Sequence, residues 1–305
     1  MSAGAVAQRP AQILLAFAVV YLVWGSTYLA IRIGVQELPA VLFAGARFLI
    51  AAPLMLAYAW WRGARLPRAR GDWIAIAATS TMMLVGANGL VTWSEQWVES
   101  NQAALIVATS ALWMAWFGTW GRGGERPGNW TIVGLLMGFG GVVVLVGAGL
   151  SLQAAPVVAY VALLVSPMLW AAGSIYSRRR PVGCAPAMTA ALQMLFTGIV
   201  MTALGLALGE APRWHWSVDG IAALLYLAVF GSCIAYGAYF WLVHQVTPSQ
   251  LGTYAYVNPA VAVLLGWLIL DEHLSRSQLL GTAIILAGVV IVTWASRPQA
   301  TARRG

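Results

Sequence analysis

Residues 13–33 read ILLAFAVVYLVWGSTYLAIRI, an apolar stretch with a single charged residue, Arg32. About 20 helical residues, at a rise of 1.5 Å each, span the roughly 30 Å hydrocarbon core of a bilayer. Similar stretches fill most of the 305-residue chain, in which 61% of residues are hydrophobic and only 9% are charged. That composition exceeds what a soluble domain of this length needs. The sequence therefore predicts an all-α integral membrane protein.

We expect ten transmembrane helices, joined by loops too short to form a soluble domain. Their ranges are Ile13–Ile33, Val41–Trp61, Trp73–Thr92, Asn101–Trp120, Trp130–Gly147, Pro156–Tyr176, Pro186–Leu208, Val218–Leu242, Gln250–Leu270 and Gln278–Trp294.

Arginine is concentrated on one side of the expected membrane, and the chain has no lysine. With ten helices, the termini and the even-numbered loops share a side, which holds Arg9, Arg62, Arg65, Arg68, Arg70, Arg122, Arg126, Arg178, Arg179, Arg180, Arg297, Arg303 and Arg304. The opposite loops hold only Arg213 and Arg276. Because cationic loops stay in the cytoplasm, we expect both termini to be cytoplasmic. The net charge of +8 thus reflects topology, and we predict no nucleic-acid partner.

The two halves of the sequence resemble each other at a nearly constant offset. The pairs at 146 residues are Trp24 and Trp170, Tyr28 and Ser174, Arg32 and Arg178, and Arg47 and Gln193. The pairs at 147 residues are Glu125 and Glu272, Gly134 and Gly281, and Gly141 and Gly288. We therefore predict two five-helix repeats, residues 1–149 and 150–305. Five is odd, so the repeats enter the membrane in opposite directions. Inverted repeats are typical of secondary transporters, although a duplicated bundle without transport is the alternative.

Several segments also resemble a known family. They are Leu22 to Tyr28, Ala111 to Trp113, Glu125 to Pro127, Gly134 to Val144, Asn258-Pro259, Asp271 to Leu274 and Gly281 to Val290. Together they are similar to the paired pattern of the EamA-type drug/metabolite transporters. The resemblance implies a ten-helix carrier, in many cases a bacterial exporter of amino acids or other metabolites. The first copy departs from the pattern, because Leu112-Trp113 stands where a proline is usual. We therefore expect the fourth helix to bend less than the ninth.

Polar and aromatic side chains inside the spans indicate which helices surround a cavity, because such groups need partners in hydrocarbon. They favour helices 1, 3, 4, 6, 8 and 9, whereas the glycine-rich fifth and tenth helices suit tight packing at the periphery. The candidate substrate-binding residues are Trp24, Thr27, Tyr28, Asn88, Thr92, Thr109, Trp113, Ser166, Trp170, Ser174, Tyr236, Tyr239, Tyr254 and Asn258. The alternatives are interfacial or packing roles for the aromatic residues and self-bonding for the Ser and Thr hydroxyls.

Arg47 is the deepest cation, since it lies inside the second helix. It either attracts a carboxylate-bearing substrate or serves a structural role, pairing with backbone carbonyls or with Glu95. Gln193 is its counterpart in the second repeat. Arg32, one residue from the end of its helix, is expected to reach the membrane surface. Pro167 and Pro259 each remove a backbone donor within a helix, which makes them candidate hinges or merely tolerated prolines.

The distribution of acids and histidines limits the possible functions. All nine Asp and Glu residues fall in or beside loops, which disfavours a proton-coupled drug-cation exchanger. One deep arginine and no lysine disfavour a carrier of phosphorylated sugars. A membrane prenyl or acyl transferase needs an acid pair or a His–acid pair, yet His215, His244 and His273 all lie at loops. We predict no catalytic residue, cofactor or metal site.

The sequence thus predicts a multi-pass inner-membrane transporter that exports amino acids, neutral and aromatic ones above all, or similar small metabolites. Alternating access between two halves is the expected mechanism. A broad-specificity drug/metabolite efflux carrier is the alternative within the same class. The expected partners are a small-molecule substrate and the lipid bilayer, and the sequence predicts no particular oligomeric state, so that a monomer is consistent with it.

Overall fold

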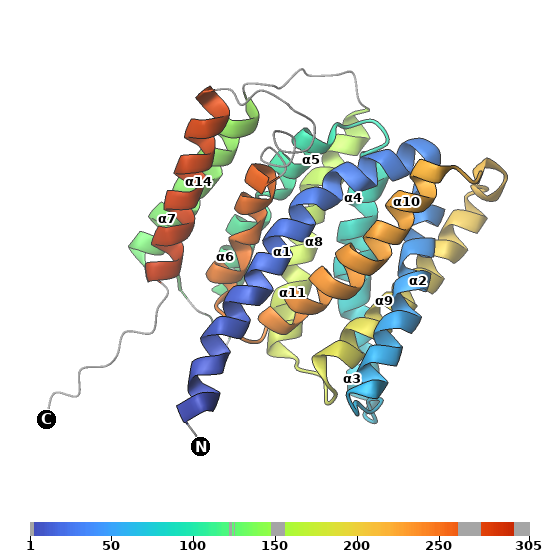
Figure 1. The fold of residues 1–305 in the computed structure, drawn as a ribbon, viewed down its shortest axis with the longest axis horizontal. Helices are drawn as coiled ribbons and strands as arrows, with labels where there is room; N and C mark the ends of the chain where they lie inside the picture. Colours follow the sequence, from blue (N-terminus) through green and yellow to red (C-terminus); the bar gives the residue numbers. More distant parts are fainter. Residues whose placement is uncertain (1–2, 122–123, 125, 148–155, 262–275, 296–305) are drawn as a thin grey trace, which may run out of the picture.

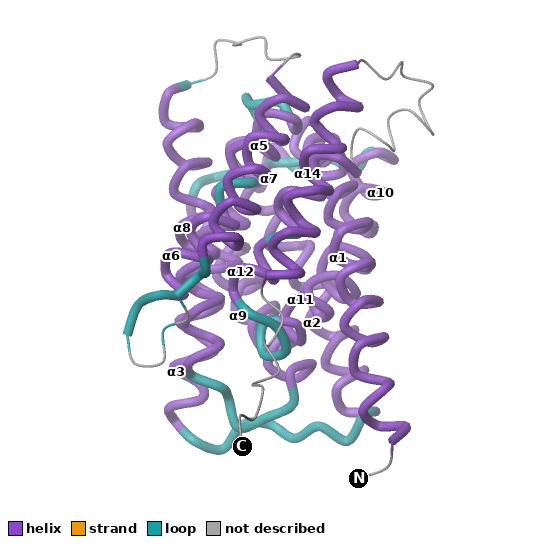
Figure 2. The backbone as a smooth tube through the Cα atoms, turned by 90° about the vertical axis from the view of Figure 1, so that its left-hand side faces the viewer, coloured by secondary structure: helices purple, strands orange, loops and turns teal. Residues whose placement is uncertain are grey.

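The structure, a computed structural model, describes residues 3–121, 124, 126–147, 156–261 and 276–295, and every regular element in these ranges is a helix (Figures 1 and 2). In chain order the elements are α1 (Ala3–Glu37), α2 (Ala40–Trp61), α3 (Arg70–Thr79), η1 (Ser80–Asn88), α4 (Gly89–Ser94), α5 (Ser100–Val107), α6 (Ser110–Gly118), α7 (Asn129–Gly147), α8 (Val157–Arg179), α9 (Pro186–Ala207), η2 (Ala211–Arg213), α10 (Val218–Tyr226), η3 (Leu227–Tyr236), α11 (Gly237–Leu242), α12 (Pro248–Gly252) and α14 (Arg276–Ala295). Residues 254–261 are helical as well.

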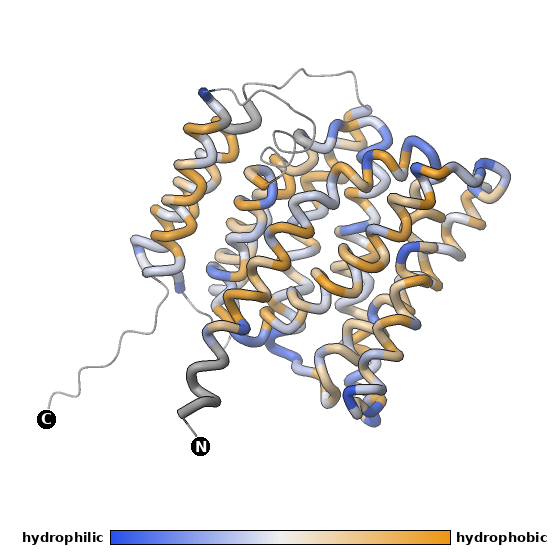
Figure 3. The backbone as a smooth tube through the Cα atoms, viewed as in Figure 1, coloured by the Kyte–Doolittle hydropathy of each residue, from blue (hydrophilic) through white to orange (hydrophobic). Residues whose placement is uncertain are grey.

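Six helical stretches in the described part of the chain are long and apolar enough to cross a membrane. They are Pro10–Glu37, Ala40–Trp61, Arg70–Ser94, Val157–Arg179, Pro186–Ala207 and Val218–Leu242. Three apolar helices are shorter, namely Gln102–Gly118, Asn129–Val144 and Leu279–Ala295. The expected span Gln250–Leu270 lies partly outside the described residues. Figure 3 shows apolar helix bodies with hydrophilic residues mostly at the loops, as a membrane protein requires.

The first helix shows how side chains divide between lipid and protein. Leu15, Leu22 and Leu29 recur every seven residues along α1 and are each more than half exposed. Val20 and Trp24 point the other way and are buried in the protein core. This pattern is inside-out relative to a soluble helix, because the exposed face is the more apolar one.

Two pairs of helices pack along each other in opposite directions. On α2 and α9, a Cβ added at Gly198 would lie 2.8 Å from the backbone nitrogen of Leu49, and one added at Gly205 would lie 2.9 Å from that of Leu42. Residue numbers therefore fall along α2 as they rise along α9. The two helices approach closely because small residues line their contact.

The glycines of α7 and α14 make the second close contact, at the edge of the bundle in Figure 1. A Cβ added at Gly134 would lie 2.9 Å from the carbonyl oxygen of Gly288, and one at Gly141 would lie 3.0 Å from that of Gly281. The contacts are reciprocal, since Gly134 corresponds to Gly281 and Gly141 to Gly288. Such exchange of partners is the mark of a two-fold relation between similar segments. It also makes α7 and α14 antiparallel, at the periphery as the sequence predicts.

Two of the spans contain a π-helical turn at corresponding places. The element η1 begins at Ser80 and η3 at Leu227, which are 147 residues apart. π-Helical segments insert an extra residue into a turn and often mark functional sites. Here both segments lie between two α-helical pieces of one span.

The fourth and the ninth helices are both interrupted, each at a threonine. The helix α5 ends at Val107 and α6 begins at Ser110. At the break, the Thr109 hydroxyl donates to the Ile106 carbonyl at 2.7 Å. Thr253, after α12, makes the same bond to the Gln250 carbonyl at 2.7 Å. A hydroxyl that bonds to its own backbone competes with the helix, so the fourth helix breaks without a proline. Whether it bends less than the ninth helix stays a prediction, because the expected ninth span lies partly outside the described residues.

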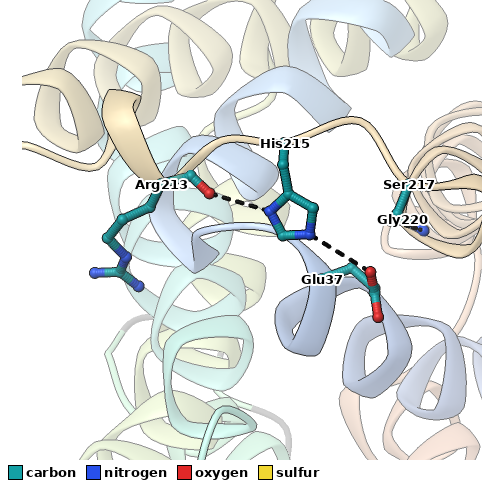
Figure 4. A network of polar contacts seen from close by, with 5 residues as sticks. All are labelled: Glu37, Arg213, His215, Ser217 and Gly220. Carbon is teal, nitrogen blue, oxygen red and sulfur yellow. Dashed lines mark hydrogen bonds and ion pairs between the residues drawn. The ribbon is translucent and has the colours of Figure 1, made fainter.

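Side chains from elsewhere in the chain satisfy the free amides where several helices begin. Glu210 accepts from the backbone nitrogen of Leu42 at 2.8 Å at the start of α2, and Ser217 accepts from that of Gly220 at 3.1 Å in α10. Beside Ser217, His215 Nε2 lies 3.6 Å from a carboxylate oxygen of Glu37 (Figure 4). His215 is exposed and Glu37 is partly exposed, so solvent screens this contact and it contributes no more than about 1 kcal/mol.

Candidate functional site

A cavity lies between the helices and leaves about 70 Å³ for the centres of water-sized molecules, which is room for several of them. Eleven of the residues singled out from the sequence line it, namely Trp24, Thr27, Tyr28, Arg47, Asn88, Ser166, Pro167, Trp170, Tyr236, Tyr254 and Asn258. They come from α1, α2, η1, α8, η3 and the helical segment 254–261. The structure therefore gathers into one wall side chains that are more than 200 residues apart in the sequence.

Four aromatic rings pack together at the cavity wall, three of them lining it and Tyr239 behind them, and we call Trp24, Trp170, Tyr239 and Tyr254 the aromatic layer. The ring of Trp24 lies 5.0 Å from that of Tyr239, 5.1 Å from that of Tyr254 and 5.4 Å from that of Trp170, measured between centroids. These separations are typical of favourable edge-to-face and tilted contacts. Along α1 the cavity-lining residues run from Trp24 to Ile31, so the aromatic layer lies at the side of the cavity toward the start of α1.

Hydrogen bonds hold the aromatic layer in place. The indole nitrogen of Trp170 donates to the Tyr239 hydroxyl at 2.9 Å, and Ser174 bonds to the same hydroxyl at 2.7 Å. The indole nitrogen of Trp24 donates to the carbonyl of Gly231 in η3 at 3.1 Å. Each bond joins two different spans. Two of them connect α8 with α11, and the third connects α1 with η3.

Arg47 projects from α2 into the cavity wall and is only 4% exposed. Its Nε donates to the hydroxyl of Ser232 in η3 at 2.9 Å, and that hydroxyl donates to the Leu227 carbonyl at 3.0 Å. The guanidinium carbon lies 5.0 Å from the centre of the Phe48 ring. Gly231 allows this approach, since a Cβ there would lie 3.1 Å from Arg47 Nη2. The expected pairing with Glu95 is absent among the described residues, because both carboxylate oxygens of Glu95 are without a hydrogen-bond partner.

Two asparagines leave acceptors unused in the cavity wall. The side-chain oxygens of Asn88 and Asn258 are buried and have no hydrogen-bond partner. Asn258 as a whole is 1% exposed. A buried amide oxygen without a partner costs free energy, typically about 1–3 kcal/mol, so it is usually explained by an absent ligand or water.

Several candidate residues lie outside the cavity and make local contacts instead. Thr92 donates to the Asn88 carbonyl at 2.9 Å, and Thr109 forms the helix break described above. The Trp113 ring packs on those of Trp116 and Phe117, at centroid distances of 5.3 and 5.7 Å. Thr92 and Thr109 thus bond to their own helix, and Trp113 packs on neighbouring rings, which are the alternatives to substrate binding that the sequence left open.

Other candidates stand one step behind the cavity wall. Ser174 and Tyr239 support Trp170, as described. Gln193 accepts from the Tyr236 hydroxyl at 2.7 Å and donates to Thr79 at 2.6 Å. Pro259 adjoins the lining residue Asn258 without lining the cavity, and α8 continues as one helix through Pro167.

Sequence reasoning missed the apolar part of the wall and the contribution of the second helix. The missed lining residues are Ile31, Phe48, Leu84, Ala87, Val91, Val107 and Gly231. Helical spacing from the polar candidates finds some of them, because Ile31 follows Thr27 by four residues and Val91 follows Asn88 by three.

At each end of the bundle an arginine bonds to the backbone at the end of another span. Arg32 in α1 donates to the carbonyl of Glu95, just after α4, so it is held by the protein and does not simply reach for the surface. Its counterpart Arg178 in α8 donates to the carbonyls of Val243 and Val246, just after α11. Cations suit such carbonyls because helix C-termini carry partial negative charge. We call these two contacts the arginine clasps.

Glu95 lies beside a loop, as the sequence indicates, yet it is completely buried. Burial raises the pKa of its carboxyl well above the ordinary value, and the nearby Arg32 guanidinium lowers it only in part. Among the described residues that line the cavity there is no Asp or Glu. The described residues also contain no group of three or more metal-ligating side chains close enough to hold an ion.

An apolar helical bundle with a cavity between its spans defines the class of polytopic membrane proteins. Comparison with known proteins narrows the class. The model of the EamA-like transporter family matches residues 11–147 and again residues 157–294. The chain belongs to the EamA-like transporter family.

Individual relatives agree with this assignment. The chain is 40% identical over 276 residues to the uncharacterized inner membrane transporter YedA of Escherichia coli K12, which covers 90% of this chain and 88% of YedA. It is 24% identical over 282 residues to a probable amino-acid metabolite efflux pump of the same organism, over 89% of this chain and 91% of the pump. A solved crystal structure that is 21% identical matches with a TM-score of 0.77, over 94% of this chain and 98% of that one, which concerns the fold alone.

The predicted class, family and location are confirmed by these relatives and by the six apolar spans. The protein is a multi-pass inner-membrane transporter and handles a small-molecule solute within a lipid bilayer. Because the family consists of transporters, the prenyl or acyl transferase alternative is set aside.

Proposed function

We propose that the protein is a secondary transporter that exports amino acids, with neutral and aromatic ones favoured, or similar small metabolites. The chemistry of the cavity wall carries this proposal. Indole, phenol, amide and hydroxyl groups line the cavity together with one arginine. Aromatic faces suit an apolar side chain, and the polar groups suit the ends of a small solute. The likeness to a probable amino-acid metabolite efflux pump points to the same class of solute.

The proposal includes ten helices arranged as two inverted repeats, residues 1–149 and 150–305, with both termini in the cytoplasm. Three observations support it. The pairs α2–α9 and α7–α14 are antiparallel, the family model matches each half once, and α1 begins at the end of the bundle where α14 finishes (Figure 1). The arginine-rich loops favour the cytoplasm for that end.

Alternating access is the mechanism that this arrangement supports. A cavity between two inverted halves can open to each side in turn when the halves rock. The arginine clasps lie at corresponding places in the two halves, one at each end of the bundle. We propose that Arg32 holds one end closed and Arg178 the other, and that the two clasps release in alternation.

A broad-specificity drug/metabolite efflux carrier is the second candidate, favoured by the extensive aromatic surface. Cationic drugs, however, would meet Arg47 and no carboxylate from the described part of the wall, and like charge disfavours their binding. A carrier of phosphorylated sugars would need more cations than Arg47, which is the one cation that the described residues contribute to the cavity wall.

Counterflow in proteoliposomes tests the proposed function. The purified protein is reconstituted into vesicles loaded with one unlabelled amino acid at a time, and uptake of the same labelled amino acid is followed. We expect saturable counterflow for one or more neutral or aromatic amino acids. Absence of counterflow for every amino acid, with transport of cationic dyes instead, would favour the drug carrier.

A further inference from the structure

We infer that Arg47 binds the carboxylate group of the transported solute, and therefore that a carboxylate is the feature the cavity selects. The inference rests on the proposed function in one respect, because it requires that a transported solute occupies this cavity. It goes further by naming the chemical group and the residue that recognises it.

The geometry leaves the outer edge of the guanidinium available. The bond to Ser232 uses Nε at 2.9 Å, and the ring of Phe48 covers one face at 5.0 Å. Arg47 forms no further hydrogen bond within the described part of the protein. The two terminal nitrogens can therefore present the parallel N–H pair that matches a carboxylate.

Two arginines outside the cavity, the half-buried Arg178 and the exposed Arg179, show what a structural role looks like in this protein. Arg178 donates to the carbonyls of Val243 and Val246, and Arg179 donates to those of Phe117 and Gly118 at 3.4 and 3.2 Å. Each guanidinium thus satisfies carbonyls where another span ends. Arg47 donates to no backbone carbonyl of the described residues, so a structural clamp does not account for its terminal nitrogens.

Charge balance supports the same conclusion. A buried cation in a membrane protein needs an anion or strong acceptors nearby, since the desolvation cost is several kcal/mol or more. No carboxylate of the described chain forms an ion pair with Arg47, and none lines the cavity. A solute carboxylate would supply the missing negative charge.

The remaining wall suits an α-amino acid as the bearer of that carboxylate. The unpartnered oxygens of Asn88 and Asn258 can accept hydrogen bonds from an ammonium group. Trp24 and Trp170 offer aromatic surface for an apolar side chain. A simple aromatic carboxylate shares the group that Arg47 recognises but leaves both asparagine oxygens unused.

The test compares matched probes on the full-length protein in proteoliposomes. Phenylalanine, tryptophan and leucine are each compared with their amides and their decarboxylated amines, and 3-phenylpropionate is added as a carboxylate without an amine. Inhibition of counterflow and the shift in thermal unfolding midpoint are measured for every probe. On the wild-type protein we expect carboxylates to bind at least about tenfold more tightly than the matched amides, as one charge-assisted bidentate pair provides.

The variants then assign the preference to one residue. Arg47→Gln should lose about 10- to 100-fold in affinity for the carboxylates and change the affinity for amides by less than about threefold. Arg47→Lys should lie between the two, because it keeps the charge without the planar fork. Arg62→Gln is the matched control, since Arg62 follows α2 on the exposed surface. Ser232→Ala removes the bond to Nε and should keep most of the preference for carboxylates.

The outcomes separate the two proposals. The inference about Arg47 is wrong if the wild-type protein binds amides or amines as tightly as the matched carboxylates. It is also wrong if the folded Arg47→Gln variant keeps the full preference for carboxylates. In both cases the proposal of amino-acid transport can still hold. If 3-phenylpropionate is transported and no amino acid is, the amino-acid proposal fails and the inference about Arg47 holds. The comparison of acids with amides needs only the wild-type protein. It therefore tests whether the cavity selects a carboxylate even if Arg47→Gln does not fold.

Discussion

The side-chain oxygen of Gln193 accepts a 2.7 Å hydrogen bond from the hydroxyl of Tyr236, a residue of the cavity wall. Gln193 takes the place in the second half of the chain that Arg47 takes in the first, and both bond to residues of η3. Thr79 completes a buried chain from α3 through α9 to η3. The two halves therefore use matching positions to hold the same wall, one with a neutral side chain and one with a charged side chain.

Replacing Gln193 by leucine should lower the stability of the folded protein. The substitution leaves the Tyr236 hydroxyl without its acceptor in a dry interior, which costs about 1–3 kcal/mol. The thermal unfolding midpoint in detergent measures the change. Gln36→Leu is the control, because Gln36 is exposed near the end of α1. Equal midpoints for the Gln193 variant and the wild type would show that the buried chain is not stabilising.

Trp170→Ala should impair transport while the protein stays folded, because it opens the aromatic layer and strips the Tyr239 hydroxyl of a donor. We expect transport to fall at least about tenfold and expect Trp170→Phe to retain more, since it keeps an aromatic ring. Initial rates of counterflow provide the measurement, with Trp61→Ala at the exposed end of α2 as control. Wild-type kinetics in Trp170→Ala would remove the layer from the transport path.

The close contact of α7 with α14 predicts that adding one methyl group destabilises the protein at Gly288 but not at Gly140. A Cβ at Gly288 would lie 2.7 Å from the backbone nitrogen of Gly138, whereas a Cβ at Gly140 meets nothing within 4 Å. Gly288→Ala should therefore lower the free energy of unfolding by about 1–3 kcal/mol through overpacking, and the unfolding midpoint should fall with it. Gly140→Ala should be neutral or slightly stabilising, because alanine favours helix by up to about 1 kcal/mol. The opposite order would contradict the antiparallel contact.

Stability should depend on pH through Glu95. Its pKa is raised by burial, so the folded protein keeps this proton to higher pH than the unfolded chain does. The associated stability is fully present below the ordinary pKa of a glutamate, and it is lost as the pH rises toward the folded-state value. Raising the pH from about 5 to about 9 should thus lower the unfolding midpoint of the wild type more than that of Glu95→Gln. Parallel pH profiles for the two proteins would exclude this role.

The arginine clasps predict opposite effects for two corresponding substitutions. A cysteine at Val107, in the cavity wall, serves as reporter after Cys184 and Cys233 are replaced by serine. Arg32→Gln weakens the contact with the end of α4, so an impermeant thiol reagent should label the reporter faster from the outer face. Arg178→Gln should speed labelling from the cytoplasmic face. Equal effects of both substitutions on one face would argue against paired clasps.

The positions of the six long spans could be predicted, because a run of apolar residues of membrane length is visible in the sequence itself. The predicted span Val41–Trp61 differs from α2 by one residue, and polar types such as Asn88 and Asn258 identified helices that line the cavity. Apolar wall residues such as Leu84 could not be predicted, since nothing distinguishes them from lipid-facing leucines until the helices are packed.

Features that depend on contacts between distant segments also escaped prediction. The break at Thr109 has no proline to announce it, and it occurs where α12 crosses α6 so closely that a Cβ at Gly252 would lie 2.8 Å from the Ala111 Cα. Glu95 reads as a loop residue, and only the fold shows that it is buried beside Arg32. Hydropathy along one helix carries no information on such crossings.

The most direct test of the account asks whether the cavity is reached from both sides of the membrane. The protein used carries the Val107→Cys reporter and has Cys184 and Cys233 replaced by serine, with both arginine clasps intact. It is labelled separately in right-side-out and in inside-out vesicles. We predict labelling in both preparations and protection in both by the amino acid that gives the strongest counterflow. Labelling from a single face only, under transport conditions and unaffected by any transported solute, would contradict a cavity that opens alternately to the two sides.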